Sequence, residues 1–187
     1  MRVTGGSLAG RGLRAPKGLD TRPTTDRVRE SLFGALEHAE GAPLAGARVL
    51  DLFAGSGALG IEAISRGAAF CLFVETAAAA RAAIRDNAEA LALNGVTRLH
   101  RRSATSLGAK PAGMGAAFTL AFADPPYRQG LLGPTLDGLR AGAWLAPGAL
   151  VLCEQDRRED APQACGFEAE GERAYGDTVI RTLRHAP

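Results

Sequence analysis

The sequence predicts an α/β protein: a Rossmann-like, mainly parallel, doubly wound sheet of seven strands with an antiparallel edge. Apolar strand-like runs alternate with helix-like segments from about residue 45 onward, and a glycine-rich turn follows the first run. Two further β-like runs, joined by a short turn at 175–177, close the chain. Helical crossovers are typical of parallel sheets, whereas a tight turn joins antiparallel strands. The 187 residues are enough for one such domain with a small extension.

That extension is expected to comprise residues 1–40, and the main domain residues 41–187. Glycines and a closing proline interrupt residues 1–20, which favours a small β-hairpin or an extended arm. Thr24 or Thr25 can cap the helix that follows. The apolar stripe of this helix has the spacing i, i+4, i+8 and consists of Val28, Leu32 and Leu36.

Hydrophobic periodicity divides the main domain into its elements. We expect strands at about 47–53, 69–75, 97–102, 117–123, 148–154, 167–174 and 178–183. We expect helices at about 57–66, 77–93 and 129–141. Phe33, Phe53 and Trp144 are interpreted as packing residues of the resulting core.

Basic residues are concentrated near the N-terminus. The net charge of the chain is only +2, yet residues 1–30 contain seven basic side chains against three acids. A basic arm on a slightly acidic body indicates a polyanionic partner. A solvated arm without any partner is the alternative.

The cysteines and histidines predict neither a disulfide framework nor a metal site. The three cysteines form no CxxC pair, and the three histidines lie far from one another and from any acid cluster. The N-terminus lacks the apolar core of a signal peptide, and charges and glycines interrupt the apolar stretch at 44–64. We therefore expect a cytoplasmic protein with reduced thiols, no metal and no membrane partner.

A strand followed by a glycine-rich turn predicts a nucleotide-like cofactor. Gly55, Gly57 and Gly60 match the pattern G-x-G-x-x-G at the start of a helix. Glycines there permit a tight turn, close approach of the backbone to a ligand and close helix–strand packing. Dinucleotide-binding folds use the same pattern, so the glycines alone do not identify the cofactor. Phe53, in the same turn, is counted with the cofactor-binding residues.

Two acids favour S-adenosylmethionine over NAD. Asp51 precedes the turn at the end of its strand, where a carboxylate would repel a pyrophosphate. It can instead pair, directly or through water, with the ammonium group of S-adenosylmethionine. Glu75 ends the second strand, 20 residues after Gly55, where an acid accepts hydrogen bonds from ribose hydroxyls.

The turn Asp124-Pro125-Pro126-Tyr127 carries the predicted chemistry. It follows an apolar strand, and the carboxyl ends of parallel strands line the ligand crevice of such sheets. The Asp124 carboxylate and the Pro125 carbonyl can bind the two N–H groups of a nucleobase amine and favour its pyramidalisation towards a methyl donor. The rigid prolines fix the turn, and Tyr127 offers a flat face on which an extruded base can stack.

The chain resembles the bacterial small-subunit (16S) rRNA guanine-N2 methyltransferases, which are class I S-adenosylmethionine-dependent enzymes. Four segments carry the resemblance: residues 1–11, the stretch TRPTTDRVRESLF at 21–33, LDLFAGSGALGIEAISRG at 50–67, and the turn at 124–127. The second of these segments is specific to the group, whereas the last two are generic to methyltransferases.

The resemblance implies methylation of one guanine amine in small-subunit rRNA, within a partly assembled subunit. The arm would cover the cofactor and contact RNA phosphates, through Arg11, Arg22, Arg27 and Arg29. Relatives place an acid after the third strand to contact adenine. Ser103 or a backbone group would serve here, because no acid stands at that position. Asn87 is interpreted as a structural hydrogen-bonding residue.

Three other functions remain open on the sequence. The turn at 124–127 suits an N6-adenine methyltransferase acting on DNA or RNA. The glycine pattern suits an NAD-linked oxidoreductase, against which Asp51 argues. The third is a non-catalytic RNA-binding protein with a vestigial cofactor site, which the intact Asp51, Glu75 and Asp124 make a weaker interpretation.

Overall fold

The computed structural model describes residues 1–16, 25–37 and 44–186, and it contains both strands and helices in the predicted order. The strands are β1 (Arg48–Leu52), β2 (Phe70–Val74), β3 (Thr97–His100), β4 (Phe118–Ala123), β5 (Leu145–Asp156), β6 (Phe167–Tyr175) and β7 (Thr178–His185). The helices are α1 (Asp26–Glu37), α2 (Ala58–Ser65), α3 (Ala78–Ala90) and α4 (Leu132–Ala141). Short 3₁₀ turns are η1 (Gly6–Leu8), η2 (Ala104–Ser106) and η3 (Ala112–Met114).

The strands form one seven-stranded sheet in the order β3-β2-β1-β4-β5-β7-β6. β1 to β5 pair in parallel, and β7 pairs antiparallel with both β5 and β6. The predicted doubly wound sheet with an antiparallel edge is therefore confirmed. The chain order reverses between β1 and β4, which is where ligands bind in sheets of this type.

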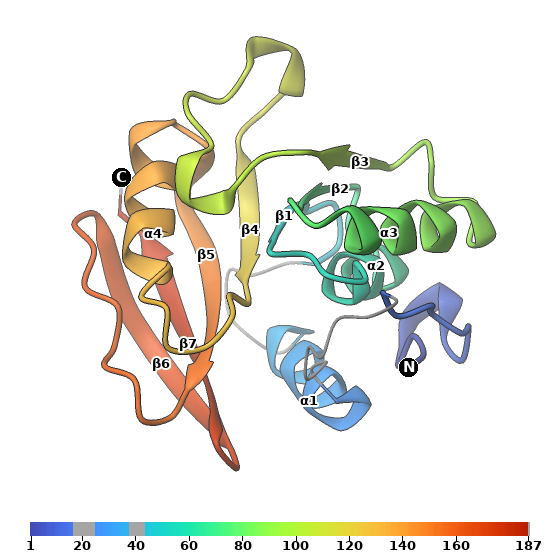
Figure 1. Cartoon of the computed structure of the whole chain (residues 1–187), viewed down its shortest axis with the longest axis horizontal. Coiled ribbons are helices and arrows are strands. Elements are labelled where there is room, and N and C mark those ends of the chain that lie inside the picture. The colour runs from blue at the N-terminus through green and yellow to red at the C-terminus, as the bar shows by residue number, and fades with distance from the viewer. Residues whose placement is uncertain (17–24, 38–43, 187) are drawn as a thin grey trace.

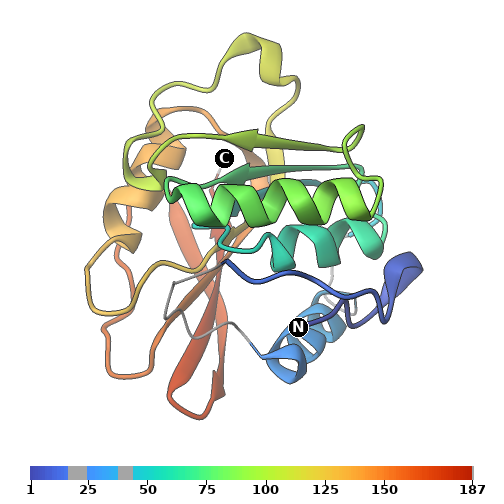
Figure 2. The same ribbon diagram turned by 45° about the vertical axis from the view of Figure 1, so that its right-hand side comes forward.

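Helices cover both faces of the sheet (Figures 1 and 2). Residues of α1, α2 and α3 share one apolar cluster with the sheet, and residues of α4 and η2 share a second one with its other face. The packing roles of Phe33 and Trp144 are confirmed, since both side chains are fully buried. Phe33 brings α1 onto the sheet, with its ring centroid 5.5 Å from that of Phe122.

The N-terminal segment packs against α2 and α3 but is not a regular hairpin. One antiparallel bridge, between Arg2 and Gly12, closes a loop that contains η1. The predicted β-hairpin is thus reduced to this bridge, because the chain turns through glycines with positive φ at 6 and 10. Val3 and Leu13 lie buried in the same cluster as α2. Thr25 caps α1 with its hydroxyl, which accepts the Val28 amide at 3.3 Å, whereas Thr24 lies outside the described residues.

None of the helices within the described ranges is both long enough and apolar enough to cross a bilayer.

Candidate functional site

The two predicted loops leave the sheet at the same edge. β1 and β4 are parallel neighbours, and Leu52 at the end of β1 is paired with Ala123 at the end of β4. The glycine-rich turn follows Leu52, and the Asp124 turn follows Ala123, so both begin side by side at the carboxyl ends of adjacent strands (Figure 1). This juxtaposition is the geometric condition for one ligand site shared by both loops.

Backbone conformation and packing explain the glycines of the first turn. Gly55 and Gly57 have positive φ of 55° and 78°, a region that suits glycine. Gly60 is required by close packing instead, because a Cβ atom there would lie 2.4 Å from Cys71 Sγ on β2. Phe53 also has a positive φ, 58°, which is unusual for a bulky residue and turns the chain out of β1.

Asp51 is a buried carboxyl group at the base of this turn. Its side chain is 1% exposed, and its Oδ2 accepts the Gly60 amide at 2.9 Å. The pKa of Asp51 is raised to about 8, chiefly by burial; the bond from Gly60 acts against this shift, and the nearby charge of Glu75 adds to it. A cation brought to this carboxylate would relieve the cost of ionising it, so the site suits the ammonium group of a ligand.

Glu75 joins the glycine-rich turn to the beginning of α3. Its Oε2 accepts the Gly55 amide at 2.9 Å, and its Oε1 accepts the amides of Thr76 and Ala77 at 2.7 and 2.8 Å. The carboxylate thereby fixes the two residues that lead into α3 and ties the glycine-rich turn to the end of β2. Its predicted contact with ribose hydroxyls stays a prediction.

Ser103 follows β3 at the same edge of the sheet. Its hydroxyl lies 2.8 Å from the hydroxyl of Thr105 and accepts the Thr105 amide at 3.3 Å, which caps η2. The predicted contact of Ser103 with an adenine ring also stays a prediction.

In the second loop, the hydroxyl of Tyr127 is held by two partners. It donates to Glu154 Oε1 at 2.8 Å and lies 2.9 Å from the hydroxyl of Thr178. Burial raises the pKa of Tyr127, and the charges of Glu154 and Asp124 add to the shift. Pro125 is buried and Pro126 exposed. The ring of Tyr127 is therefore fixed in place beside two carboxylates.

A small pocket lies beside the Asp124 turn, and sequence reasoning missed one of its acids. Asp124 and Glu154 both line it, together with apolar residues that include Leu32 of α1 and Leu59 of α2. Glu154 is only 8% exposed. Its signal in the sequence is weak, because one acid near the end of an apolar strand resembles an ordinary strand terminus.

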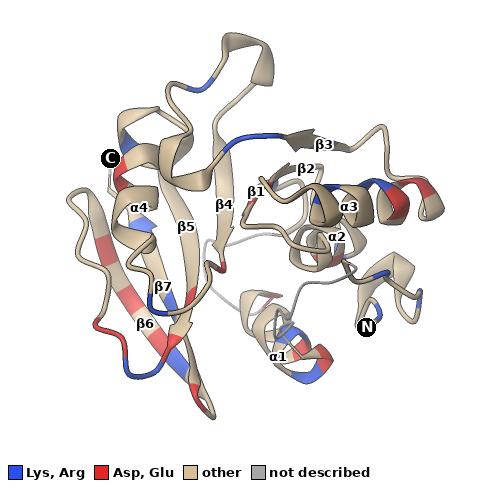
Figure 3. Cartoon of the chain, in the orientation of Figure 1, with Lys and Arg blue, Asp and Glu red and all other residues tan. Residues whose placement is uncertain are grey.

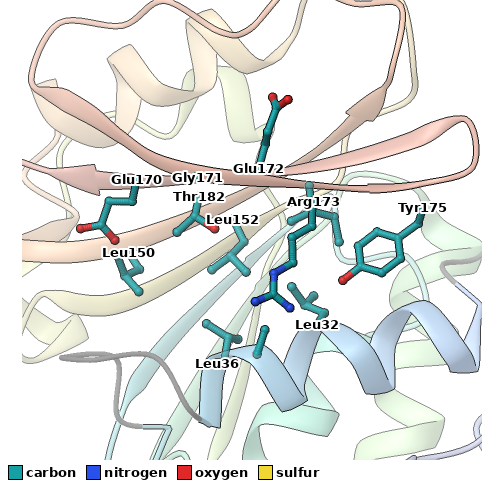
Figure 4. A pocket seen from close by; sticks show the side chains of 12 residues that line it. Leu32, Leu36, Leu150, Leu152, Glu170, Gly171, Glu172, Arg173, Tyr175 and Thr182 are labelled. Carbon is teal, nitrogen blue, oxygen red and sulfur yellow. The ribbon is translucent and has the colours of Figure 1, made fainter.

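A wider groove adjoins this pocket and shares Leu32, Leu152 and Ile180 with it. Its volume is about 260 Å³, and it lies between α1 and the β6–β7 hairpin. Figure 4 shows Arg173 and Tyr175 extending from β6 towards α1. The Tyr175 hydroxyl lies 3.0 Å from the hydroxyl of Ser31 on α1, so the two walls of the groove touch at one end.

Glu62 of α2 is a second acid that the sequence did not single out. It is fully buried and accepts the amides of Thr4 and Gly5, both at 2.8 Å. It also accepts Arg66 Nε at 2.9 Å. Buried carboxylates need such partners, and these bonds fasten the N-terminal segment to α2.

Asn87 of α3 fastens the same segment further along. It donates to the backbone carbonyls of Arg14 and Ser56 at 3.0 and 2.9 Å, and accepts the Arg14 amide at 2.8 Å. The interpretation of Asn87 as a structural hydrogen-bonding residue is confirmed. Through it, the N-terminal segment is linked to the glycine-rich turn that contains Ser56.

Arg29 does not have the role that was predicted for it. Its side chain is fully buried, where it pairs with Asp26 at 2.8 Å and lies 3.5 Å from Glu62 Oε2. A guanidinium enclosed between α1 and α2 presents no surface to a phosphate, so the expected RNA contact is wrong for this residue. The alternative of a solvated helix face is wrong for Arg29 as well.

Of the other three residues predicted to contact RNA, two are exposed and one lies outside the part of the chain that the structure describes. Arg11 and Arg27 are exposed, and Arg11 also donates to the Ala90 carbonyl at 3.1 Å. Arg22 lies outside the described residues. Figure 3 shows basic positions on the N-terminal loop, and basic and acidic positions together on α1. Among the described residues, no group of three or more histidine, cysteine or acidic side chains could hold a metal ion.

Comparisons with known proteins point to methyltransferases. The family described as "Conserved hypothetical protein 95" matches residues 1–184. The chain is 38% identical to the ribosomal RNA small subunit methyltransferase D of Escherichia coli over 183 residues, which covers 97% of this chain and 88% of that protein. The Haemophilus influenzae protein of the same name is 30% identical over 158 residues, covering 84% of this chain and 79% of its own length.

A comparison with solved structures also finds similarity to a protein named as a methyltransferase. A solved Escherichia coli structure named "Putative methyltransferase yhhF" is similar with a TM-score of 0.83 at 34% identity, covering 100% of this chain and 98% of that one. The similarity to this structure covers the whole chain, and so includes Asp51, the glycine-rich turn and Asp124.

Proposed function

The chain belongs to the family described as "Conserved hypothetical protein 95", and on that premise we propose that it transfers a methyl group from S-adenosylmethionine to the 2-amino group of a guanine in small-subunit ribosomal RNA. The names of the curated relatives support rRNA as the substrate and methylation as the reaction. The choice of the guanine amine comes from the resemblance in sequence, and the Asp124 turn supplies acceptors for the two N–H groups of such an amine.

One observation carries the proposal: Leu52 and Ala123 are paired at the ends of parallel neighbours. The cofactor turn and the acidic Pro-Pro turn therefore start side by side, as a transfer between two bound molecules requires. A methyl group passes directly from donor to acceptor only when both are held in line at contact distance.

The residues of the first turn fit the cofactor. Asp51 is buried with a raised pKa and would gain a partner in the ammonium group, while Gly55 and Gly57 leave the turn without side chains in a ligand's way. Glu75 would accept the ribose hydroxyls and Ser103 would face the adenine. S-adenosylmethionine supplies an electrophilic methyl group on its sulfonium, so no metal or covalent enzyme intermediate is needed.

The second turn acts on the acceptor. The Asp124 carboxylate and the Pro125 carbonyl accept the two N–H groups of the exocyclic amine, which concentrates its lone pair on nitrogen and aims it at the methyl donor. Asp124 then takes the proton that the methylated nitrogen releases. Tyr127, whose hydroxyl is anchored by Glu154 and Thr178, stacks on the extruded base.

The N-terminal residues 1–40 contribute to RNA binding in this proposal, and residues 41–187 form the methyltransferase domain. Arg11 and Arg27 are exposed and suited to phosphates, as is Arg22 by its place in the sequence. The substrate is a partly assembled small subunit in the cytoplasm, where such particles are made.

The test is methyl transfer followed by nucleoside analysis. The protein is incubated with S-adenosylmethionine carrying a labelled methyl group and with small-subunit particles or rRNA from cells lacking this gene. Labelled N2-methylguanosine is the expected product, and mapping then locates the base. Labelled N6-methyladenosine, or transfer to DNA alone, would contradict the proposal in favour of an adenine methyltransferase. Thermal stabilisation by NAD and not by S-adenosylhomocysteine would contradict the cofactor.

A further inference from the structure

Asp124 and Glu154 stand side by side at the carboxyl edge of the sheet. Phe122 pairs with Leu152, and Ala123 with Cys153, in the parallel register of β4 and β5. Continuing the register by one residue places Asp124 beside Glu154. Alternation along both strands directs the two side chains to the face that carries Phe122 and Leu152. Accordingly, both acids line the pocket beside the Asp124 turn.

A pocket lined by two adjacent carboxylates suits a ligand that offers several hydrogen-bond donors side by side. Guanine is such a ligand, because N1–H and the 2-amino group are neighbouring donors on one edge of the base. Adenine presents its 6-amino group beside an unprotonated N1, whose lone pair would face the second carboxylate. The pair of acids therefore matches guanine and opposes adenine.

We propose that Glu154 is a specificity-determining residue that accepts the N1–H of the target guanine while the Asp124 turn holds its 2-amino group. This inference rests on the guanine function proposed above. A carboxylate has about four acceptor positions, so the bond from Tyr127 to Glu154 Oε1 leaves the group able to accept the base as well.

A different role for Glu154 must be distinguished from this one. By anchoring the hydroxyl of Tyr127, Glu154 could act on the reaction only through the stacking ring. If Glu154 acted only in this way, its replacement would change the rate equally whether or not the base carries a proton on N1. Base recognition is sensitive to it, and 2-aminopurine provides the contrast, since it has a 2-amino group but no proton on N1.

The experiment compares two acceptors in the whole protein. Small-subunit rRNA is assembled with either guanine or 2-aminopurine at the mapped position, and kcat/KM is measured for each. The variant is Glu154→Gln, whose amide can donate to an unprotonated N1. The control is Tyr127→Phe, which removes the bond to Glu154 but keeps the ring and the carboxylate.

We expect the wild type to prefer guanine, and Glu154→Gln to reduce that preference by roughly 10-fold or more, the usual size of one lost base contact. Loss of the 6-oxygen in 2-aminopurine affects both proteins equally and cancels in this comparison. Tyr127→Phe should slow both acceptors by the same factor and leave the preference unchanged.

An equal loss on both acceptors in Glu154→Gln would overturn the inference and assign Glu154 to positioning Tyr127. That result would leave the proposed function intact, because the wild type would still make N2-methylguanosine. If the wild type instead methylates adenine, both the proposed function and this inference are wrong.

Thermal unfolding checks that Glu154→Gln is folded. If that variant is unfolded, Glu154→Asp replaces it in the experiment, because the shorter side chain withdraws the carboxylate from the base by one methylene. The same loss of preference is expected there, and an unchanged preference would overturn the inference.

Discussion

The guanidinium of Arg29 and the carboxylate of Glu62 are both fully buried, with Arg29 Nε 3.5 Å from Glu62 Oε2. They join α1 to α2, and Glu62 also holds the amides of Thr4 and Gly5. Glu62 thus fastens to the core the segment that sequence analysis assigned to RNA, and Asn87 holds the same segment further along.

Replacing that acid is expected to destabilise the protein strongly. Glu62→Gln removes the buried one of the two carboxylates that face the guanidinium of Arg29, and it weakens the attachment of the N-terminal segment. Breaking a buried pair in this way costs about 3–5 kcal/mol. Urea denaturation measures the change, and Glu30→Gln, an exposed acid on α1, is the control, with an effect within about 0.5 kcal/mol. Equal stabilities for the two variants would show that the buried cluster contributes little.

Stability without cofactor should fall as the pH rises. The folded pKa of Asp51, about 8, lies above the ordinary value near 4, so between these pH values the folded protein holds a proton that the unfolded chain has lost. This contribution to stability is full below about pH 4, declines through the window and is gone above about pH 8. Asp51→Asn should lack it. The free energy of unfolding at pH 5 and pH 8 is compared for both proteins, and an identical pH dependence would contradict the assignment.

Gly60 should not tolerate a side chain. In Gly60→Ala the new Cβ meets Cys71 Sγ at 2.4 Å and Asp51 Oδ2 at 3.0 Å, which forces α2 away from β2. A destabilisation of about 1–3 kcal/mol is expected, with weaker binding of S-adenosylhomocysteine. Gly133→Ala in α4 is the matched control, since its Cβ would meet nothing within 4 Å and alanine favours the helix. A Gly60→Ala protein as stable as the control would refute the packing argument.

Asp124→Ala is expected to abolish methyl transfer while leaving the affinity for S-adenosylhomocysteine nearly unchanged. The carboxylate acts on the acceptor amine, and removing one such group usually costs about 100-fold or more in turnover. Calorimetric titration gives the affinity and labelled methyl transfer gives the rate. Asp137→Ala, on the exposed side of α4, is the control and should retain its rate. Wild-type turnover in Asp124→Ala would remove the assigned role.

Reversing the charge of Arg27 should weaken RNA binding and its dependence on salt. Each phosphate contact that is lost lowers the slope of log K against log salt by about one. Arg140→Glu, an exposed arginine of α4 on the opposite face of the sheet, should leave the slope unchanged. Filter binding of small-subunit rRNA over a range of salt measures both. A slope that is the same in Arg27→Glu and the wild type would mean that α1 does not touch the backbone.

Elements with a strong local pattern could be predicted from the sequence. The hydrophobic runs of β1, β2 and β4 are buried on both faces and were located within a residue or two of their bounds. β5 begins earlier than expected, at Leu145, because it continues through a Pro-Gly pair and shifts its register against β4 between Phe118 and Leu120. The strand begins at Leu145 because this residue pairs with Phe118 of β4, and nothing in the local sequence indicates this pairing.

The sequence alone determined the order of strands and helices, the glycine-rich turn and the acidic Pro-Pro turn, because each of these depends on residues close together in the chain. Tertiary structure decided which side chains meet. It buried Arg29 against Glu62, 33 positions away, and removed it from the surface. It also brought Glu154 beside Asp124, since a parallel register places distant residues in one row. Charge and burial at a given position depend on such neighbours, and local sequence does not reveal them.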